Sequence, residues 1–162
     1  MPRIVLETII KAPQKLVFDL SRSIDLHIIS TDKTNEKAIA GRTEGLIELG
    51  ETVTWHAKHL GVYQNFTSKV IGCKEPEYFA DIMLKGAFKS FKHEHFFSYE
   101  NNETTLIDVM EFASPLGLLG KLVDFLFLEN YMKGFLVLRN NTIKEFAESD
   151  KWKEIIKNQV YE

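Results

Sequence analysis

The chain has 162 residues, of which 44% are hydrophobic and 27% are charged, and its formal net charge is −3. This length and composition predict one globular domain that spans residues 1–162, and they exclude a disordered, collagen-like or low-complexity protein. Because the net charge is negative and no run of basic residues stands out, the sequence also argues against nucleic-acid binding.

The first quarter of the chain predicts a strand, two short helices and a brief second strand. Alternating apolar and polar side chains are typical of a strand, proline is favoured in the first turn of a helix, and serine is favoured as a helix cap. On these grounds Pro13 begins one helix and Ser23 begins the next. The predicted elements are a strand at residues 3–11, helices at 13–21 and 23–29, and a strand at 38–40.

The middle of the chain predicts an antiparallel sheet. Five strand-length segments follow one another, and glycine, proline or asparagine turns separate them. Successive strands with short connections favour a meander, in which each strand pairs with the next. The predicted strands are residues 51–60, 62–73, 78–85, 89–99 and 104–113.

The C-terminal part of the chain predicts one long helix. After Ser114 and Pro115, apolar side chains recur at intervals of three and four residues from Leu122 to Phe146. A sheet of six or seven strands needs a cover for its apolar face, and this helix is the largest cover available. Because a twisted sheet cannot follow a straight helix along its whole length, we expect an apolar cavity between them.

Several features of the sequence indicate a cytoplasmic protein. The single cysteine, Cys73, excludes an internal disulfide and any metal site built from several cysteines. Charges interrupt residues 1–13, which therefore do not predict a secretory signal. The strongly apolar residues 116–138 contain four charged side chains, whereas a membrane span needs about 20 mostly apolar residues. We therefore expect no membrane span.

Four segments resemble the START-like or Bet v 1-like superfamily, which includes polyketide cyclases, and in particular its bacterial ligand-binding branch. They are IKAPQKLVFDL (10–20), GETVTWHAKHLGV (50–62), GAFKSFKHEHFF (86–97) and TTLIDVMEFASPLGLLGKLVD (104–124), which Arg139 follows. The resemblance covers nearly the whole chain. It implies an α+β helix-grip fold: a curved antiparallel sheet of six to seven strands wrapped around a long C-terminal helix, with two short helices after the first strand.

The resemblance specifies the fold more strongly than the function, because this scaffold serves lipid carriers, cyclases and stress-response proteins. The sequence departs from the family pattern at two positions. Ala87 and Phe91 stand where such sequences often carry proline and tryptophan. We therefore expect the pocket to be reshaped at this point.

Alternation along the strands predicts which polar side chains point inward. His93 and His95 share one face of their strand with phenylalanines, and Asp108 shares the more apolar face of the next strand. If the two strands pair as a hairpin, a histidine and Asp108 lie about 5 Å apart across the sheet. A buried carboxylate needs such a partner.

Three roles remain open for these side chains. They form a buried polar pair that fixes the strand register, they contact a ligand, or a histidine acts as a general acid–base with its pKa tuned by Asp108. A His-x-His pair with Asp108 also has the composition of a metal site, but the match is loose, and we predict no metal and no cofactor. No nucleophile accompanies the set, which favours a binding protein over an enzyme.

We therefore expect the cavity to bind a small, largely hydrophobic molecule, as a carrier or a sensor. The alternative is a cyclase-, dehydratase- or isomerase-like enzyme that uses the His–Asp pair in the same cavity. A homodimer is compatible with the sequence, which does not determine the oligomeric state. The candidate catalytic residues are His93, His95 and Asp108. The predicted ligand-binding residues are Trp55, His59, Phe91, His93, His95, Asp108, Met110, Phe112, Leu122 and Phe125.

Overall fold

Seven antiparallel strands form one curved sheet in this computed structural model, which describes residues 1–115 and 127–161. The sheet order is β1-β7-β6-β5-β4-β3-β2, so the meander predicted for the middle of the chain is confirmed, and the N-terminal strand joins its far edge. The strands are β1 (Arg3–Ile10), β2 (Lys37–Gly41), β3 (Thr52–His59), β4 (Val62–Lys74), β5 (Tyr78–Lys85), β6 (Ser90–Glu100) and β7 (Glu103–Ala113).

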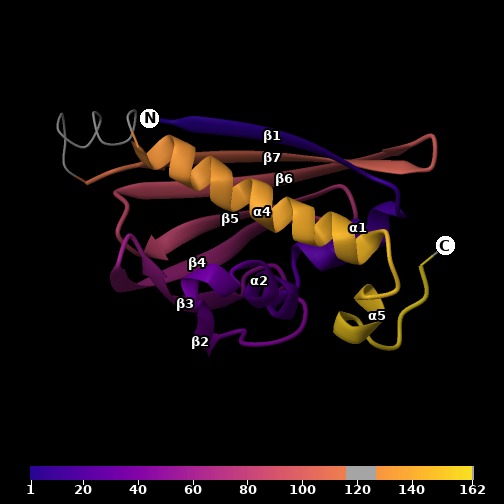
Figure 1. The fold of residues 1–162 in the computed structure, drawn as a ribbon, viewed down its shortest axis with the longest axis horizontal. Coiled ribbons are helices and arrows are strands. Elements are labelled where there is room, and N and C mark those ends of the chain that lie inside the picture. The colour runs from indigo at the N-terminus through magenta and orange to yellow at the C-terminus, as the bar shows by residue number, and fades with distance from the viewer. Residues whose placement is uncertain (116–126, 162) are drawn as a thin grey trace.

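The long helix α4 lies across one face of this sheet, and the short helices lie beside it (Figure 1). Both predicted helix starts are confirmed, because Pro13 is the residue before α1 and the Ser23 hydroxyl accepts a 3.2 Å hydrogen bond from the amide of Leu26. This is the predicted helix-grip arrangement. The helical elements are α1 (Gln14–Ser21), α2 (Ile24–Ser30), the 3-10 turn η1 (Asp32–Thr34), α4 (Glu129–Ala147) and α5 (Trp152–Ile155).

The long C-terminal helix that the sequence predicts is confirmed by α4, and a short helix that was not predicted follows it. Helix α4 ends at Ala147, and the chain then turns into α5. Ile156 joins the core there, and the ring of Trp152 packs edge-on against Tyr161 at a centroid distance of 5.2 Å. Among the described residues, no helix is both long and apolar enough to cross a membrane.

The core beneath α1 is filled by aromatic and aliphatic side chains. Phe18 is fully buried, and its ring meets Phe79 at 5.7 Å and Phe97 at 5.3 Å in edge-on contacts. Such pairs contribute about 1 kcal/mol beyond their buried area. This cluster of buried side chains bounds one end of the inner face, and Phe79 is part of both the cluster and the cavity lining described below.

The β6–β7 hairpin fixes the register of the inward-facing polar residues. Asn101 and Asn102 form its two-residue loop, and both have the positive φ that the tight hairpin turn requires. His95 then lies directly opposite Asp108. His93, His95 and Asp108 are all buried on the inner face, as the alternation predicts.

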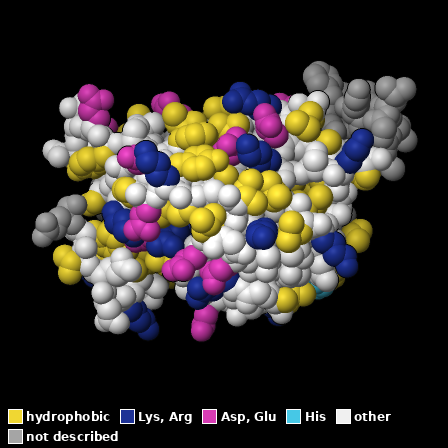
Figure 2. All heavy atoms as spheres, turned by 180° about the vertical axis from the view of Figure 1, so that it is seen from behind, with side chains coloured by type: hydrophobic (Ala, Val, Ile, Leu, Met, Phe, Trp, Pro, Cys, Tyr) yellow, Lys and Arg dark blue, Asp and Glu magenta, His cyan; other side chains and the backbone are white. Residues whose placement is uncertain are grey.

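The outer face of the sheet mixes apolar and charged side chains (Figure 2). Val5 and Phe96 are among its exposed apolar residues, and Lys92 and Glu94 form an ion pair at 2.9 Å on the same face. An antiparallel sheet tolerates such a face because alternate side chains along each strand point away from the core. The outer face therefore does not indicate a functional site, whereas polar groups that are buried on the inner face do.

Gly41 at the end of β2 and Gly45 in the following loop offer a test of the packing at this edge. Both have left-handed φ, +75° and +72°, but a Cβ atom on Gly41 would lie 2.1 Å from the carbonyl oxygen of Thr52, whereas one on Gly45 meets nothing within 4 Å. We expect Gly45→Ala to lower the unfolding free energy by about 1–2 kcal/mol and Gly41→Ala to lower it distinctly more. Urea denaturation measures both, and equal losses would contradict close packing of β2 on β3.

Candidate functional site

A cavity of about 310 Å³ lies between the inner face of the sheet, α2 and α4. This volume is at the lower end of the range for small-molecule pockets. Most of the lining side chains are apolar or aromatic, and the histidine and carboxylate side chains among the polar ones form two groups. Six of the predicted ligand contacts line the cavity: Trp55, His59, Phe91, His93, His95 and Met110.

Two predicted contacts do not line the cavity. Asp108 is fully buried behind the two histidines, because hydrogen-bond donors from β6 and α4 surround its carboxylate. Phe112 is also fully buried, and its ring packs against Phe88 at 5.6 Å. Direct contact of Asp108 and Phe112 with a ligand stays a prediction, and in this structure the two side chains lie behind the residues that line the cavity. Leu122 and Phe125 lie outside the described residues.

The carboxylate of Asp108 is the centre of a buried polar network. Its Oδ1 accepts a 3.0 Å hydrogen bond from His93 Nε2, and its Oδ2 accepts one of 2.5 Å from the Asn140 side-chain amide. His95 Nδ1 approaches Oδ1 to 2.6 Å, but it is out of line for a directed hydrogen bond. Arg139 Nη1 lies 3.6 Å from the same oxygen. The carboxylate is thus paired on both sides, as a buried charge requires.

Burial and these neighbours act in opposite directions on Asp108. Burial raises the pKa of its carboxyl group, but His93 and His95 outweigh this and hold it well below its ordinary value. For His93, burial lowers the pKa to about 4, His95 acts in the same direction, and Asp108 opposes them. At neutral pH Asp108 is therefore ionised and His93 is neutral, with its Nε2–H donated to the carboxylate.

The network also ties α4 to the rest of the fold. Arg139 Nη2 donates a 2.7 Å hydrogen bond to the backbone carbonyl of Ser21, and the Asn140 side-chain amide donates one of 3.1 Å to Thr8 Oγ1 on β1. Arg139 belongs to the family resemblance, whereas Asn140 was not predicted, but the helix pattern contains a signal for both. They interrupt the apolar stripe of α4 between the buried Leu136 and Ile143, and polar side chains on a buried helix face need partners.

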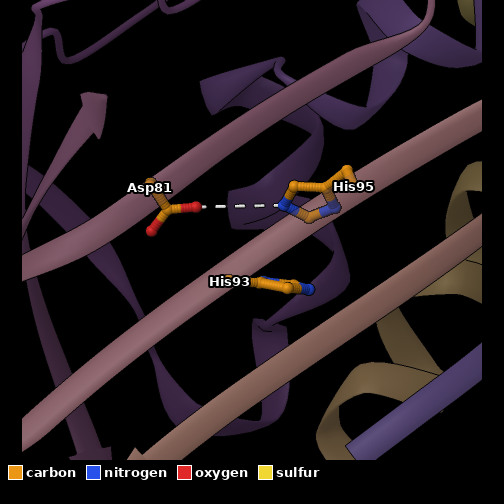
Figure 3. A group of neighbouring side chains, drawn as sticks. All are labelled: Asp81, His93 and His95. Atoms are coloured by element: carbon orange, nitrogen blue, oxygen red, sulfur yellow. Dashed lines mark ion pairs between the residues drawn. The ribbon is translucent and has the colours of Figure 1, made fainter. Parts of the chain in front are cut away.

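Asp81 is a cavity residue that the sequence reasoning missed. It lies directly opposite His93 in the β5–β6 pairing, and its Oδ1 is 3.8 Å from His95 Nε2 (Figure 3). The three side chains all line the cavity, with Asp81 on the side of the histidines away from Asp108. The first polar group of the cavity therefore consists of Asp81, His93 and His95.

The second polar group lies near α2 and comprises Glu36, His27 and His59. Glu36 Oε1 is 3.3 Å from His27 Nε2, and the His27 ring packs on Trp55 at 4.2 Å. Burial raises the pKa of Glu36, but His27 and His59 outweigh it and the net shift is downward. Glu36 Oε2 is buried with no hydrogen-bond partner in the described part of the chain. The polar segment around Glu36 contains no pattern that predicts its burial beside the cavity.

Comparisons with known proteins find similar structures but no similar sequences. No family model matches this chain, and no curated protein sequence matches it either. An aromatase/cyclase from a Streptomyces species matches with a TM-score of 0.71 at 15% identity, covering 96% of each chain. A START superfamily protein from Mycobacterium smegmatis has a TM-score of 0.68 at 11% identity, covering 90% of this chain and 97% of its own.

A major latex-like protein from Panax ginseng also matches, with a TM-score of 0.67 at 14% identity, covering 91% of this chain and 98% of its own. Identities this low establish the fold and nothing more. The chain has the helix-grip fold of the START-like and Bet v 1-like proteins, as its sequence motifs predict.

Replacing Asp108 with asparagine tests whether the polar network holds the fold together. The amide loses the negative charge next to Arg139 and brings an N–H₂ group among donors, so we expect the unfolding free energy to fall by about 3 kcal/mol. The matched control is Glu111→Gln on the same strand, whose partly exposed ion pair with Arg3 contributes less than about 0.5 kcal/mol. Chemical denaturation measures both, and similar small losses would contradict the central role of Asp108.

Proposed function

We propose that this protein binds a small, largely apolar molecule in the cavity between the sheet and α4. The supporting observation is the cavity itself, whose walls are mainly apolar and aromatic while its histidine and carboxylate side chains form two groups. Binding would come from burial of apolar ligand surface, at about 2.5 kcal/mol per 100 Å². A few well-placed polar side chains then set the orientation of the ligand.

The two polar groups indicate what the ligand carries. Glu36 Oε2 is a buried acceptor without a donor among the described residues, and it borders the cavity. An unpaired buried acceptor costs about 1–3 kcal/mol, which a ligand hydroxyl or amine would recover. A ligand with an apolar body and one hydrogen-bond donor, placed near Trp55 and Glu36, therefore suits the cavity best.

An enzyme that performs acid–base chemistry is the second candidate. The observation in its favour is that His95 and Asp81 line the same cavity, 3.8 Å apart, so a proton donor and an acceptor could both reach a bound molecule. Conversion of small cyclic or polyketide-like compounds by the wild type, lost in Asp81→Asn while binding persists, would favour the enzyme. Binding without conversion would favour the carrier or sensor.

Aminoanthracene, a small uncharged probe with an apolar body and an amine, tests the proposed binding. We expect its fluorescence to rise on binding to the wild type, and the Trp55 emission to be quenched in parallel. Because Ala57 lines the cavity and Lys58 is exposed on the other face of β3, Ala57→Phe should weaken binding at least about tenfold, or 1.4 kcal/mol. Lys58→Phe should leave it unchanged.

Two results would overturn this proposal. One is the absence of saturable binding to the wild type, and the other is an equal effect of both phenylalanine substitutions, which would place the probe outside the cavity. Trp152→Phe serves as the background for the emission measurement, since Trp152 packs on Tyr161 and is absent from the cavity lining. Native mass spectrometry of freshly purified protein then identifies any molecule that remains bound.

A further inference from the structure

Three polar side chains face one another at the cavity wall without a hydrogen bond between any two of them. One ring nitrogen each of His93 and His95 and a carboxylate oxygen of Asp81 all lie within 4.8 Å of one another (Figure 3). Within the described ranges, the one ion pair of Asp81 is the 3.8 Å contact with His95, which is too long for a hydrogen bond. The two histidines are buried and Asp81 is partly buried, so the nitrogens and the oxygen that face one another here are suited to a shared ligand.

We propose that Asp81, His93 and His95 bind a divalent transition metal ion such as Zn²⁺. Two imidazoles and one carboxylate are a donor set that proteins use for zinc and for non-haem iron. An ion at the centre of three atoms within 4.8 Å of one another is at most about 2.8 Å from each. Metal–ligand distances are about 2.0–2.2 Å, so each donor atom must move by less than about 1 Å.

Asp108 supports this site from behind instead of acting as a ligand. Histidines that bind a metal usually donate their other ring N–H to a carboxylate, which fixes the orientation of the ring. Asp108 accepts from His93 Nε2 and lies 2.6 Å from His95 Nδ1. His93 Nδ1 and His95 Nε2 therefore stay available for an ion.

The charges of the cluster favour a cation. Two carboxylates, Asp81 and Asp108, lie close to one guanidinium, that of Arg139, whose Nη1 is 3.6 Å from Asp108. The remaining negative charge sits at the cavity wall, where low polarity strengthens its attraction for a cation. The coordination positions that the protein leaves open face the cavity, where water or a donor atom of a bound molecule can complete the set.

Metal titration of the purified protein tests this site independently of the proposed function, because an ion can bind with no apolar molecule present. After treatment with a chelator and its removal, Co²⁺ is added and its visible absorption is followed, with Zn²⁺ as competitor. We expect one equivalent to bind, and Asp81→Asn and His95→Gln each to weaken binding at least about tenfold. The control is Glu94→Gln, which lies between the two histidines on the opposite face of β6 and should bind as the wild type does.

Thermal melting provides the second measurement. A ligand that binds only the folded state raises the melting temperature, so a given concentration of Zn²⁺ should stabilise the wild type and Glu94→Gln distinctly more than Asp81→Asn. Circular dichroism confirms that each variant is folded before titration. Absence of one-to-one binding by the wild type, or unchanged affinity in folded Asp81→Asn, would overturn the metal site. Aminoanthracene binding by the same variants reports on the cavity separately.

Discussion

The carboxylate of Asp108 is the constraint on which the rest of this structure depends. An ionised group with no exposed surface is strongly destabilising unless donors surround it, and here the donors come from separate parts of the chain. His93 and His95 approach from β6, and Arg139 and Asn140 approach from α4. The network thereby fixes where α4 crosses the sheet, and that position sets the space left between them. The cavity therefore depends on the same placement of α4 across the sheet that the polar network fixes.

Local patterns explain why so much of the fold follows from the sequence. The alternation of side chains along β6 and β7, together with the tight loop at Asn101 and Asn102, specifies which residues pair and which face they share. The inward positions of His93, His95 and Asp108 follow from those two facts alone. The resemblance to START-like proteins adds the wrapping of the sheet around the helix, which no local pattern contains.

The candidate site is less predictable because it depends on contacts between distant segments. Asp81 becomes a neighbour of His93 only through the β5–β6 register, and alternation within one strand does not reveal that register. Glu36 lies in a polar segment whose composition is typical of solvent-exposed turns, yet packing beside His27 buries it. The prediction that Asp108 lies on the inner face is confirmed, but its carboxylate lies behind the histidines of β6, where Asn140 and Arg139 of α4 also reach it. The direction in which such a side chain points depends on its partners in other segments, and the sequence alone does not identify those partners.

The pairing of β1 with β7 has a consequence for how the chain folds. Leu6 lies opposite Asp108, and Ile4 lies opposite Met110, so within the described residues the first strand pairs with a single strand, about a hundred positions later. On a ribosome, β1 must wait with unpaired backbone groups until β7 has emerged, while β2 to β6 can already pair with one another in order. Contacts of such long sequence separation slow folding, because the entropy of closing the loop is lost before the contacts form. The pairing of β1 with β7 therefore carries a larger loop-closure cost than the pairings between successive strands from β2 to β7.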